Sequence, residues 1–373
     1  MLALRGGGEL VALWAQLSSV IELVAGVALA GVGTGLAVYV ARTKSPERQR
    51  EMLREGLGIG LGVALPVAAL VAVGASFLSE LMAGGKLPPS VLALGAAAGW
   101  LAVIPGLING YWLGQQRRGL MLALALGSAA LALAVAGLAP GPLILPLLAA
   151  SQAAPALVIF LLRSAAAKPR FRARSHPLRR YVLPSLAIGI LSPASMLVAR
   201  GVVGESLSWH EAGVLQSLWR VSDWICGLAA GILSVYFLPR FAALRASPLL
   251  AQELRRAAAW TLLPSLVAFA GLFMVHRPLL AALYDPAFRA PDAAVALIFT
   301  GSLARIASWI PLFALYAMRR TMAITLGELF SLPLFAALLF VVGKHLTLEI
   351  AGALWLVSYA AYCAFNFRAL RRG

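Results

Sequence analysis

Charged residues are scarce in this chain, and acidic residues are the scarcest of them. Only 12% of its 373 residues are charged, whereas a soluble domain has about 25%. Hydrophobic residues make up 61%, and the mean hydropathy is +0.88. These values exclude an ordinary soluble domain and indicate a polytopic membrane protein. Because Leu, Ala and Gly dominate and strand-like alternation is rare, we expect an all-α protein rather than a β-barrel.

Cysteine is also rare, and the patterns of metal and nucleotide chemistry are missing. The two cysteines, Cys226 and Cys363, lie in apolar segments, which favours small core residues over a disulfide or a metal pair. The sequence contains no HExxH motif, no Cys/His ligand cluster and no P-loop for ATP. We therefore expect no metal, no cofactor and no catalytic residues, so an intramembrane enzyme is disfavoured.

Long apolar segments fill most of the chain. Eleven of them reach the length of about 17–25 residues that crosses a bilayer. They lie near 10–40, 56–83, 89–113, 119–139, 141–162, 181–202, 211–238, 257–275, 292–317, 322–342 and 347–367.

The basic residues gather in every second connection between these segments. Connections 41–55, 114–118, 163–180, 239–256, 318–321 and 368–373 hold 23 of the 31 Lys and Arg residues. This distribution is typical of cytoplasmic loops, and it argues against nucleic acid as the reason for the net charge of +17. The positive-inside rule predicts an outer N-terminus and an inner C-terminus. A basic inner face also suits anionic membrane lipids.

The longest basic connection, 163–180, carries seven basic residues and no acids. We interpret it as a cytoplasmic linker between two helical lobes. The first lobe is residues 1–162 with five spans, and the second is residues 181–373 with six.

A polar stripe within the seventh span is the best local indication of function. Gln216, Arg220 and Asp223 share one helical face. Charges inside a membrane segment are costly unless they face a bundle interior or a hydrated cavity. The alternative is a structural Arg220–Asp223 pair that only neutralises itself.

Arginine is the residue best suited to bind phosphate, through its planar fork of donors. Arg200, Arg220 and Arg305 all lie in spans of the second lobe, so a cavity lined by them favours an anionic head group. Further polar and aromatic residues within spans are candidates for lining the cavity, although many such residues only hydrogen-bond between helices. They are Gln216, Asn109 and Trp112 for the ligand, and Asp223, Glu22 and Glu328 for a coupling H⁺ or Na⁺.

The tract from Ser208 to Gln216 (SWHEAGVLQ), followed by Ser222-Asp223 and by Ser234 to Pro239 (SVYFLP), resembles the lipid-linked oligosaccharide flippases. The likeness is greatest to the enterobacterial common antigen (lipid III) branch, which is related to the O-antigen flippases. These proteins belong to the multidrug/oligosaccharidyl-lipid/polysaccharide exporter superfamily. Weaker likeness appears at Val38 to Ala41.

The resemblance implies two helical lobes around a central cavity in the bacterial inner membrane. It also implies transport of undecaprenyl-diphosphate-linked oligosaccharide from the cytoplasmic to the periplasmic leaflet by alternating access, for cell-surface polysaccharide biosynthesis. A polysaccharide polymerase or assembly protein is an expected partner. Members of this family have twelve spans with both termini inside, so the first family helix is expected to be missing from this sequence.

Two other interpretations stay open. The first is a multidrug or metabolite antiporter of the same superfamily, although a pump for cationic drugs is expected to have a cavity dominated by acids. The second is a non-transporting scaffold in a polysaccharide assembly complex, in which the intramembrane charges tolerate alanine.

Overall fold

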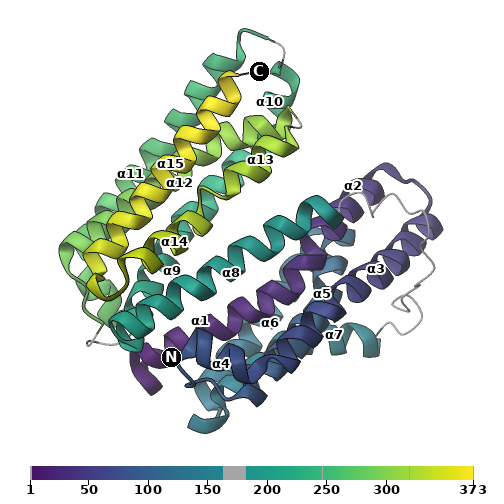
Figure 1. Ribbon diagram of the computed structural model, residues 1–373. Coiled ribbons are helices and arrows are strands. Elements are labelled where there is room, and N and C mark those ends of the chain that lie inside the picture. Colours follow the sequence, from purple (N-terminus) through teal and green to yellow (C-terminus); the bar gives the residue numbers. More distant parts are fainter. Residues whose placement is uncertain are drawn as a thin grey trace. The chain divides into compact units, whose positions relative to one another are not determined.

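The computed structural model describes residues 2–162 and 182–372, apart from residues 246, 285, 287 and 319. The described residues form helices joined by short connections and contain no strand, as the composition predicts (Figure 1). Ten segments among them are long and apolar enough to cross a membrane. The eleventh expected span, 181–202, falls on α8 (Val182–Ser206). The chain is therefore a multi-pass membrane protein, and the expected spans fall on helical segments, although 10–40, 56–83 and 322–342 are each divided between two α-helices.

The chain divides into two compact units. The first comprises residues 1–5 and 13–197, and the second comprises residues 6–12 and 198–373. This division falls inside α8, whereas the linker that we expected, 163–180, lies outside the described residues. The backbone contact between Gly26 and Gly189 joins α1 to α8, so most of α8 belongs to the first unit. Gln16 adds a hydrogen bond from its Nε2 to the carbonyl of Leu197, 3.1 Å away.

The helices of the first unit pack around a central helix, α5. The helices that begin in this unit are α1 (Leu2–Ala28), α2 (Thr34–Arg42), α3 (Pro46–Val73), α4 (Ala75–Ala83), α5 (Pro89–Gly114), α6 (Arg118–Leu138), α7 (Ile144–Leu162) and α8. A π-helical turn, Leu29–Gly33, joins α1 to α2. Pro46 begins α3, where the Ser45 hydroxyl caps the first turn, and Pro89 begins α5.

Glycines let α1 and α2 lie directly on α5. A Cβ atom at Gly99 would be 2.8 Å from the Ile21 carbonyl oxygen of α1, and one at Gly114 would be 2.7 Å from the Ala37 carbonyl oxygen of α2. Small residues at such contacts let helix backbones approach closely within a membrane, where no hydrophobic effect drives the helices together. Direct backbone contact therefore fixes the positions of α1 and α2 against α5.

The second unit packs around α12. Its helices are α9 (Trp209–Ile232), α10 (Leu238–Leu244), α11 (Leu250–Leu283), α12 (Asp292–Ala317), α13 (Thr321–Glu328), α14 (Leu332–Val342) and α15 (Leu348–Arg371). Another π-helical turn, Leu233–Phe237, joins α9 to α10. Helices α12 and α15 lie side by side (Figure 1), and Gly301 and Gly352 allow their close approach.

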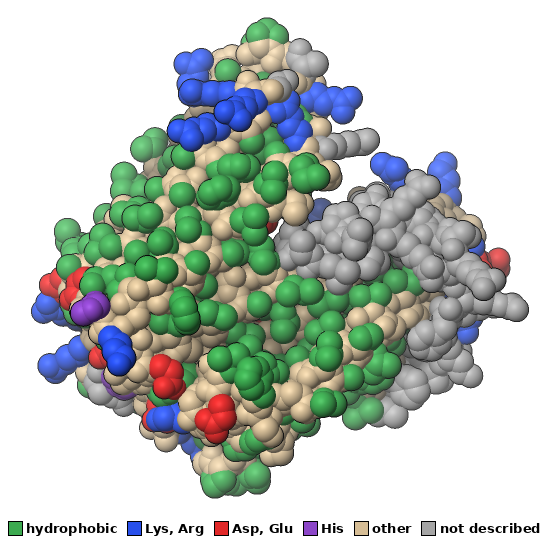
Figure 2. Space-filling model, in the orientation of Figure 1, with side chains coloured by type: hydrophobic (Ala, Val, Ile, Leu, Met, Phe, Trp, Pro, Cys, Tyr) green, Lys and Arg blue, Asp and Glu red, His purple; other side chains and the backbone are tan. Residues whose placement is uncertain are grey.

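The two ends of the second unit differ in charge. Figure 2 shows Lys and Arg side chains gathered at the end that carries α10 and the C-terminus. This end includes Arg240 and the last turn of α15, with Arg368 and Arg371. At the opposite end, where α11 ends and α12 begins, acidic, basic and histidine side chains are mixed, since Arg277 and His276 lie beside Asp292.

The close contact between α1 and α5 leads to a stability prediction. We expect Gly99→Leu to lower the midpoint of thermal unfolding in detergent by several degrees, because overpacking costs about 1–3 kcal/mol. The matched control is Gly62→Leu, since a Cβ at Gly62 would meet no atom within 4 Å. Equal midpoints for the two variants would contradict the proposed role of α5.

Candidate functional site

An ion pair crosses the interior of the second unit within its membrane spans. Arg305 on α12 donates from Nη1 to Oδ1 of Asp223 on α9, at 2.7 Å. The two side chains retain 23% and 42% of their exposure. Asp223 therefore pairs with an arginine of another helix and not with Arg220, one turn away on its own helix.

Aromatic rings hold the Arg305 guanidinium in place. Its central carbon lies 5.0 Å from the centroid of the Trp309 ring and 5.7 Å from that of Tyr359. Ring faces attract cations most strongly where water is sparse. The carboxylate and the two rings therefore offset the cost of keeping a guanidinium at this depth.

The polar network continues from Arg305 toward a second carboxylate. The Tyr359 ring contacts the Tyr362 ring at 6.4 Å, and the Tyr362 hydroxyl donates to Oε1 of Glu328 at 2.7 Å. The Ser331 hydroxyl lies 3.3 Å from the other oxygen of Glu328. Two acids that we proposed for ion coupling, Asp223 and Glu328, thus lie at the two ends of one connected set of side chains.

An aromatic cluster of Trp219, Phe335 and Trp355 packs beside this network. Their ring centroids lie 5.1–5.7 Å apart. Trp355 also donates to the Ser302 hydroxyl at 3.3 Å. Trp219 retains only 2% of its exposure, so this ring packs against protein and is unavailable to a sugar.

Arg220 lies apart from the network, on an exposed part of α9. Burial raises the pKa of the Tyr284 hydroxyl above its usual value, and the positive charge of Arg220 opposes that rise. No carboxylate among the described residues lies within ion-pair distance of Arg220. One turn before it, Gln216 is buried, and its Oε1 has no hydrogen-bond partner in the described part of the chain.

The remaining candidates have varied surroundings. Arg200 is buried in the second unit, with 3% of its exposure. Asn109, Trp112 and Glu22 belong to the first unit. Asn109 and Trp112 are half-buried on α5, and Glu22 is exposed on α1. The structure therefore brings together Arg305, Asp223 and Glu328, and it does not add Arg220 to their network.

Sequence reasoning missed the two tyrosines that link these groups. Tyr359, Tyr362 and Asn366 lie on one face of α15 at helical spacing, and all three are buried. Residues three, four or seven positions apart share one face of a helix, and this spacing identified the polar stripe on α9. Applied to tyrosine hydroxyls, the same spacing finds the stripe on α15. Asn366 donates to the Ser308 carbonyl at 3.3 Å and so ties this stripe to α12.

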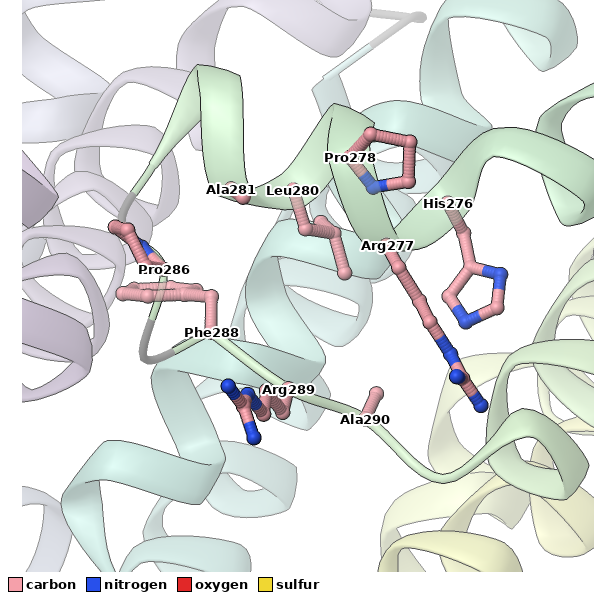
Figure 3. Close-up of a pocket in the computed structure, with 9 residues that line it drawn as sticks. All are labelled: His276, Arg277, Pro278, Leu280, Ala281, Pro286, Phe288, Arg289 and Ala290. Carbon is pink, nitrogen blue, oxygen red and sulfur yellow. The ribbon is translucent and has the colours of Figure 1, made fainter.

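The end of the second unit opposite α10 contains a separate cavity of about 700 Å³ (Figure 3). Its basic side chains are His276, Arg277 and Arg289. Arg277 forms three hydrogen bonds to Asp292, at 2.7, 2.9 and 3.3 Å, and the His276 ring lies 3.2 Å from the same carboxylate. Asp292 thus neutralises much of the positive charge on this wall.

Nothing in the described residues offers a metal site, since no three His, Cys, Asp or Glu side chains among them are grouped to hold an ion. Cys226 and Cys363 are free thiols. Cys226 is buried against the Ser302 carbonyl, as expected of a small core residue.

Comparison with solved structures identifies the fold. An inward-facing multidrug resistance MATE family transporter of the MOP superfamily matches with a TM-score of 0.73 and 14% identity, over 98% of this chain and 89% of that chain. The fold is that of the MOP-superfamily transporters. An outward-facing multidrug resistance MATE family transporter matches at 0.64, and a MOP superfamily transporter from Pyrococcus furiosus at 0.65. Each is 15% identical over 100% of this chain and 89% of that chain. No family model and no curated protein matches the sequence.

The ion pair leads to a prediction about coupling. In a double-mutant cycle of Arg305→Leu and Asp223→Leu, each single change leaves a charge inside the unit. We expect an interaction free energy of roughly 0.5–3 kcal/mol in unfolding. The double variant should therefore lose less stability than the two single variants lose together.

The matched control is the exposed pair Arg277–Asp292, which has the same 2.7 Å separation. The corresponding cycle of leucine variants is expected to give an interaction free energy below about 1 kcal/mol. Thermal unfolding in detergent measures both cycles. A coupling for Arg305–Asp223 no larger than that of the control would show that burial adds nothing to the pair.

Proposed function

We propose that this protein moves undecaprenyl-diphosphate-linked oligosaccharide from the cytoplasmic to the periplasmic leaflet of a bacterial inner membrane. Three findings support the proposal: the sequence tract that begins α9, the MOP-superfamily fold, and the arginines within the membrane spans. The neighbours show the fold alone. One of them, the transporter from Pyrococcus furiosus, is described as having a binding pocket of reverse polarity that suggests a different function. The substrate must therefore be argued from the side chains of this chain.

The main support for this proposal is that Arg220 is exposed within a membrane span and has no carboxylate partner among the described residues. An exposed guanidinium within a membrane span is costly against lipid tails and is stable in a hydrated cavity or against an anion. No described carboxylate neutralises it, whereas Asp223 is already held by Arg305. A diphosphate supplies the missing negative charge and suits the planar fork of the guanidinium.

The neighbours of Arg220 favour a glycan beside the diphosphate. The Gln216 amide oxygen lies one turn away, buried and without a partner in the described residues, and it can accept a hydrogen bond from a sugar hydroxyl once this face of α9 opens. In this proposal the polyprenyl tail stays in the lipid, and relative motion of the two units exposes the site to each side in turn. The glycan chemistry also makes a polysaccharide polymerase or assembly protein a natural partner.

We further propose that Asp223 and Glu328 couple transport to H⁺ or Na⁺, with Glu22 of the first unit as a third candidate. A phosphate group that draws Arg305 away would free the Asp223 carboxylate to bind a cation. The tyrosines between Arg305 and Glu328 join the two acids, so a change at one acid is felt at the other. The orientation follows the basic loops, with the α10 end and the C-terminus in the cytoplasm.

An antiporter for drugs or metabolites is the second candidate, because two of the solved relatives are multidrug resistance transporters. The charges argue against a cationic drug. A positive ligand would meet Arg220, while both oxygens of Glu328 are engaged by Tyr362 and Ser331. Efflux of a fluorescent organic cation from cells, rather than restoration of surface glycan, would favour this alternative.

Binding and complementation test the role of Arg220. Purified protein is expected to bind undecaprenyl diphosphate, and Arg220→Ala to weaken binding at least tenfold, while Arg220→Lys retains part of the affinity as a point charge. In a bacterial strain that lacks its lipid-linked oligosaccharide flippase, the same order is expected for surface glycan.

Arg289→Ala is the control for Arg220→Ala, since it removes an exposed arginine from the end of the same unit. Equal binding by the Arg220→Ala and unchanged proteins would remove the basis of the substrate assignment. Failure of the unchanged protein to bind undecaprenyl diphosphate at all would overturn the proposed function itself.

The coupling acids are tested together. We expect the triple variant Asp223→Asn, Glu22→Gln, Glu328→Gln to retain binding of undecaprenyl diphosphate but to lose most of its transport into the outer leaflet of vesicles under a pH or Na⁺ gradient. Glu349→Gln, which changes an acid in the first turn of α15, is the matched control. Unchanged gradient-driven transport by the triple variant would exclude these three residues from coupling.

A further inference from the structure

Four side chains form a layered stack at the end of the second unit that carries α10 and the C-terminus. The Tyr236 and Trp260 rings are nearly parallel, with an angle of 4° and a centroid separation of 5.8 Å. The Arg240 guanidinium lies 4.2 Å from the Tyr236 centroid, and the Arg256 guanidinium lies 5.4 Å from the Trp260 centroid. A cation thus contacts each ring of an aromatic pair that joins the α9–α10 turn to α11.

A tightly packed layer beneath the stack holds it in place. Phe237, the residue after Tyr236, has no exposed surface, and neither does Ala257 on α11. Both belong to one apolar cluster with Phe241, against which Tyr236 itself packs. Arg240 is also tied to Glu253 of α11 at 3.0 Å. The guanidinium groups are therefore positioned before any ligand arrives.

The exposed face of α11 continues from this stack as an apolar stripe. Trp260 retains 52% of its exposure, and Leu263 and Val267 on the following turns retain 61% and 73%. Tryptophan favours the head-group level of a membrane, whereas leucine and valine favour the lipid tails. The face therefore presents cations, then an indole ring, then an aliphatic surface. A phospholipid has a phosphate, an ester region and acyl chains in the same order.

The charge of the stack is positive. Glu253 neutralises one of its two arginines, and no described carboxylate lies within ion-pair distance of Arg256. Arg255 next to it is also exposed. Stacking on a ring occupies the face of a guanidinium but leaves the N–H groups at its edge free to donate to phosphate oxygens.

We infer that this stack is a binding site for the head group of an anionic phospholipid, a diacyl lipid with one phosphodiester and a net negative charge. Arg256 and the free edge of Arg240 would bind the phosphate, and the stripe along Leu263 and Val267 would contact an acyl chain. In the orientation proposed above, the lipid lies in the cytoplasmic leaflet. A phospholipid is favoured over the transported lipid because the stripe faces outward from α11 along the membrane span.

Lipid binding to the full-length purified protein tests the inference. Native mass spectrometry is used to compare the first bound molecule of phosphatidylglycerol with that of phosphatidylcholine. We expect phosphatidylglycerol to bind about tenfold more tightly and Arg256→Gln to remove most of this preference. Trp260→Phe, which keeps a ring, should retain the preference, and Trp260→Leu should weaken it.

The matched control is Arg289→Gln, because Arg289 is an exposed arginine at the opposite end of the same unit. An equal loss in Arg289→Gln, or an unchanged preference in Arg256→Gln, would overturn the site. Displacement of phosphatidylglycerol by a lower concentration of undecaprenyl phosphate would also overturn it, by assigning the site to a polyprenyl lipid. Since no transport is measured, these outcomes are independent of the proposed function.

Discussion

The interior of the second unit depends on the ion pair between Arg305 and Asp223. Each charge is costly alone among apolar helices, because the part of its hydration that is lost would not be repaid. Placed 2.7 Å apart and flanked by Trp309 and Tyr359, the two charges lock α9 to α12. The same guanidinium is also the start of the tyrosine link to Glu328, so structural and proposed functional roles fall on one residue.

By contrast, the helices of the first unit are held together by close backbone packing. Its central helix, α5, uses glycines to bring helix backbones into contact, and Gly26 and Gly189 do the same between α1 and α8. Backbone contact of this kind gains dispersion energy without placing charges in the membrane. A tightly packed first unit and a polar second unit are consistent with a site whose charged groups lie mainly in the second.

Arginine has three distinct roles in the second unit, and the surroundings of each side chain set its role. Arg305 is neutralised by a carboxylate and holds two helices together. Arg220 lies exposed at membrane depth, where an anionic substrate would neutralise it. Arg256 lies over an indole ring at the α10 end, where an anionic phospholipid is the natural counter-charge.

Composition and periodicity alone determined that this is a multi-pass helical protein. Apolar segments of bilayer length have no other stable form in lipid, because every backbone donor and acceptor must be satisfied within the segment. Their positions could be predicted for the same reason, and all eleven expected spans fall on helices. The polar stripe on α9 was likewise visible in the sequence, since helical spacing is a local property.

Tertiary structure decided which polar groups meet. Asp223 has Arg220 one turn away in the sequence, yet it pairs with Arg305, 82 residues later. The partner of a charge depends on which helices pack together, and contacts such as that between Gly301 and Trp355 set this packing at long range. The tyrosine stripe on α15 could be read from helical spacing, but its contacts with Arg305 and Glu328 could not, and neither could the stack at Trp260, since each of these joins residues from different helices.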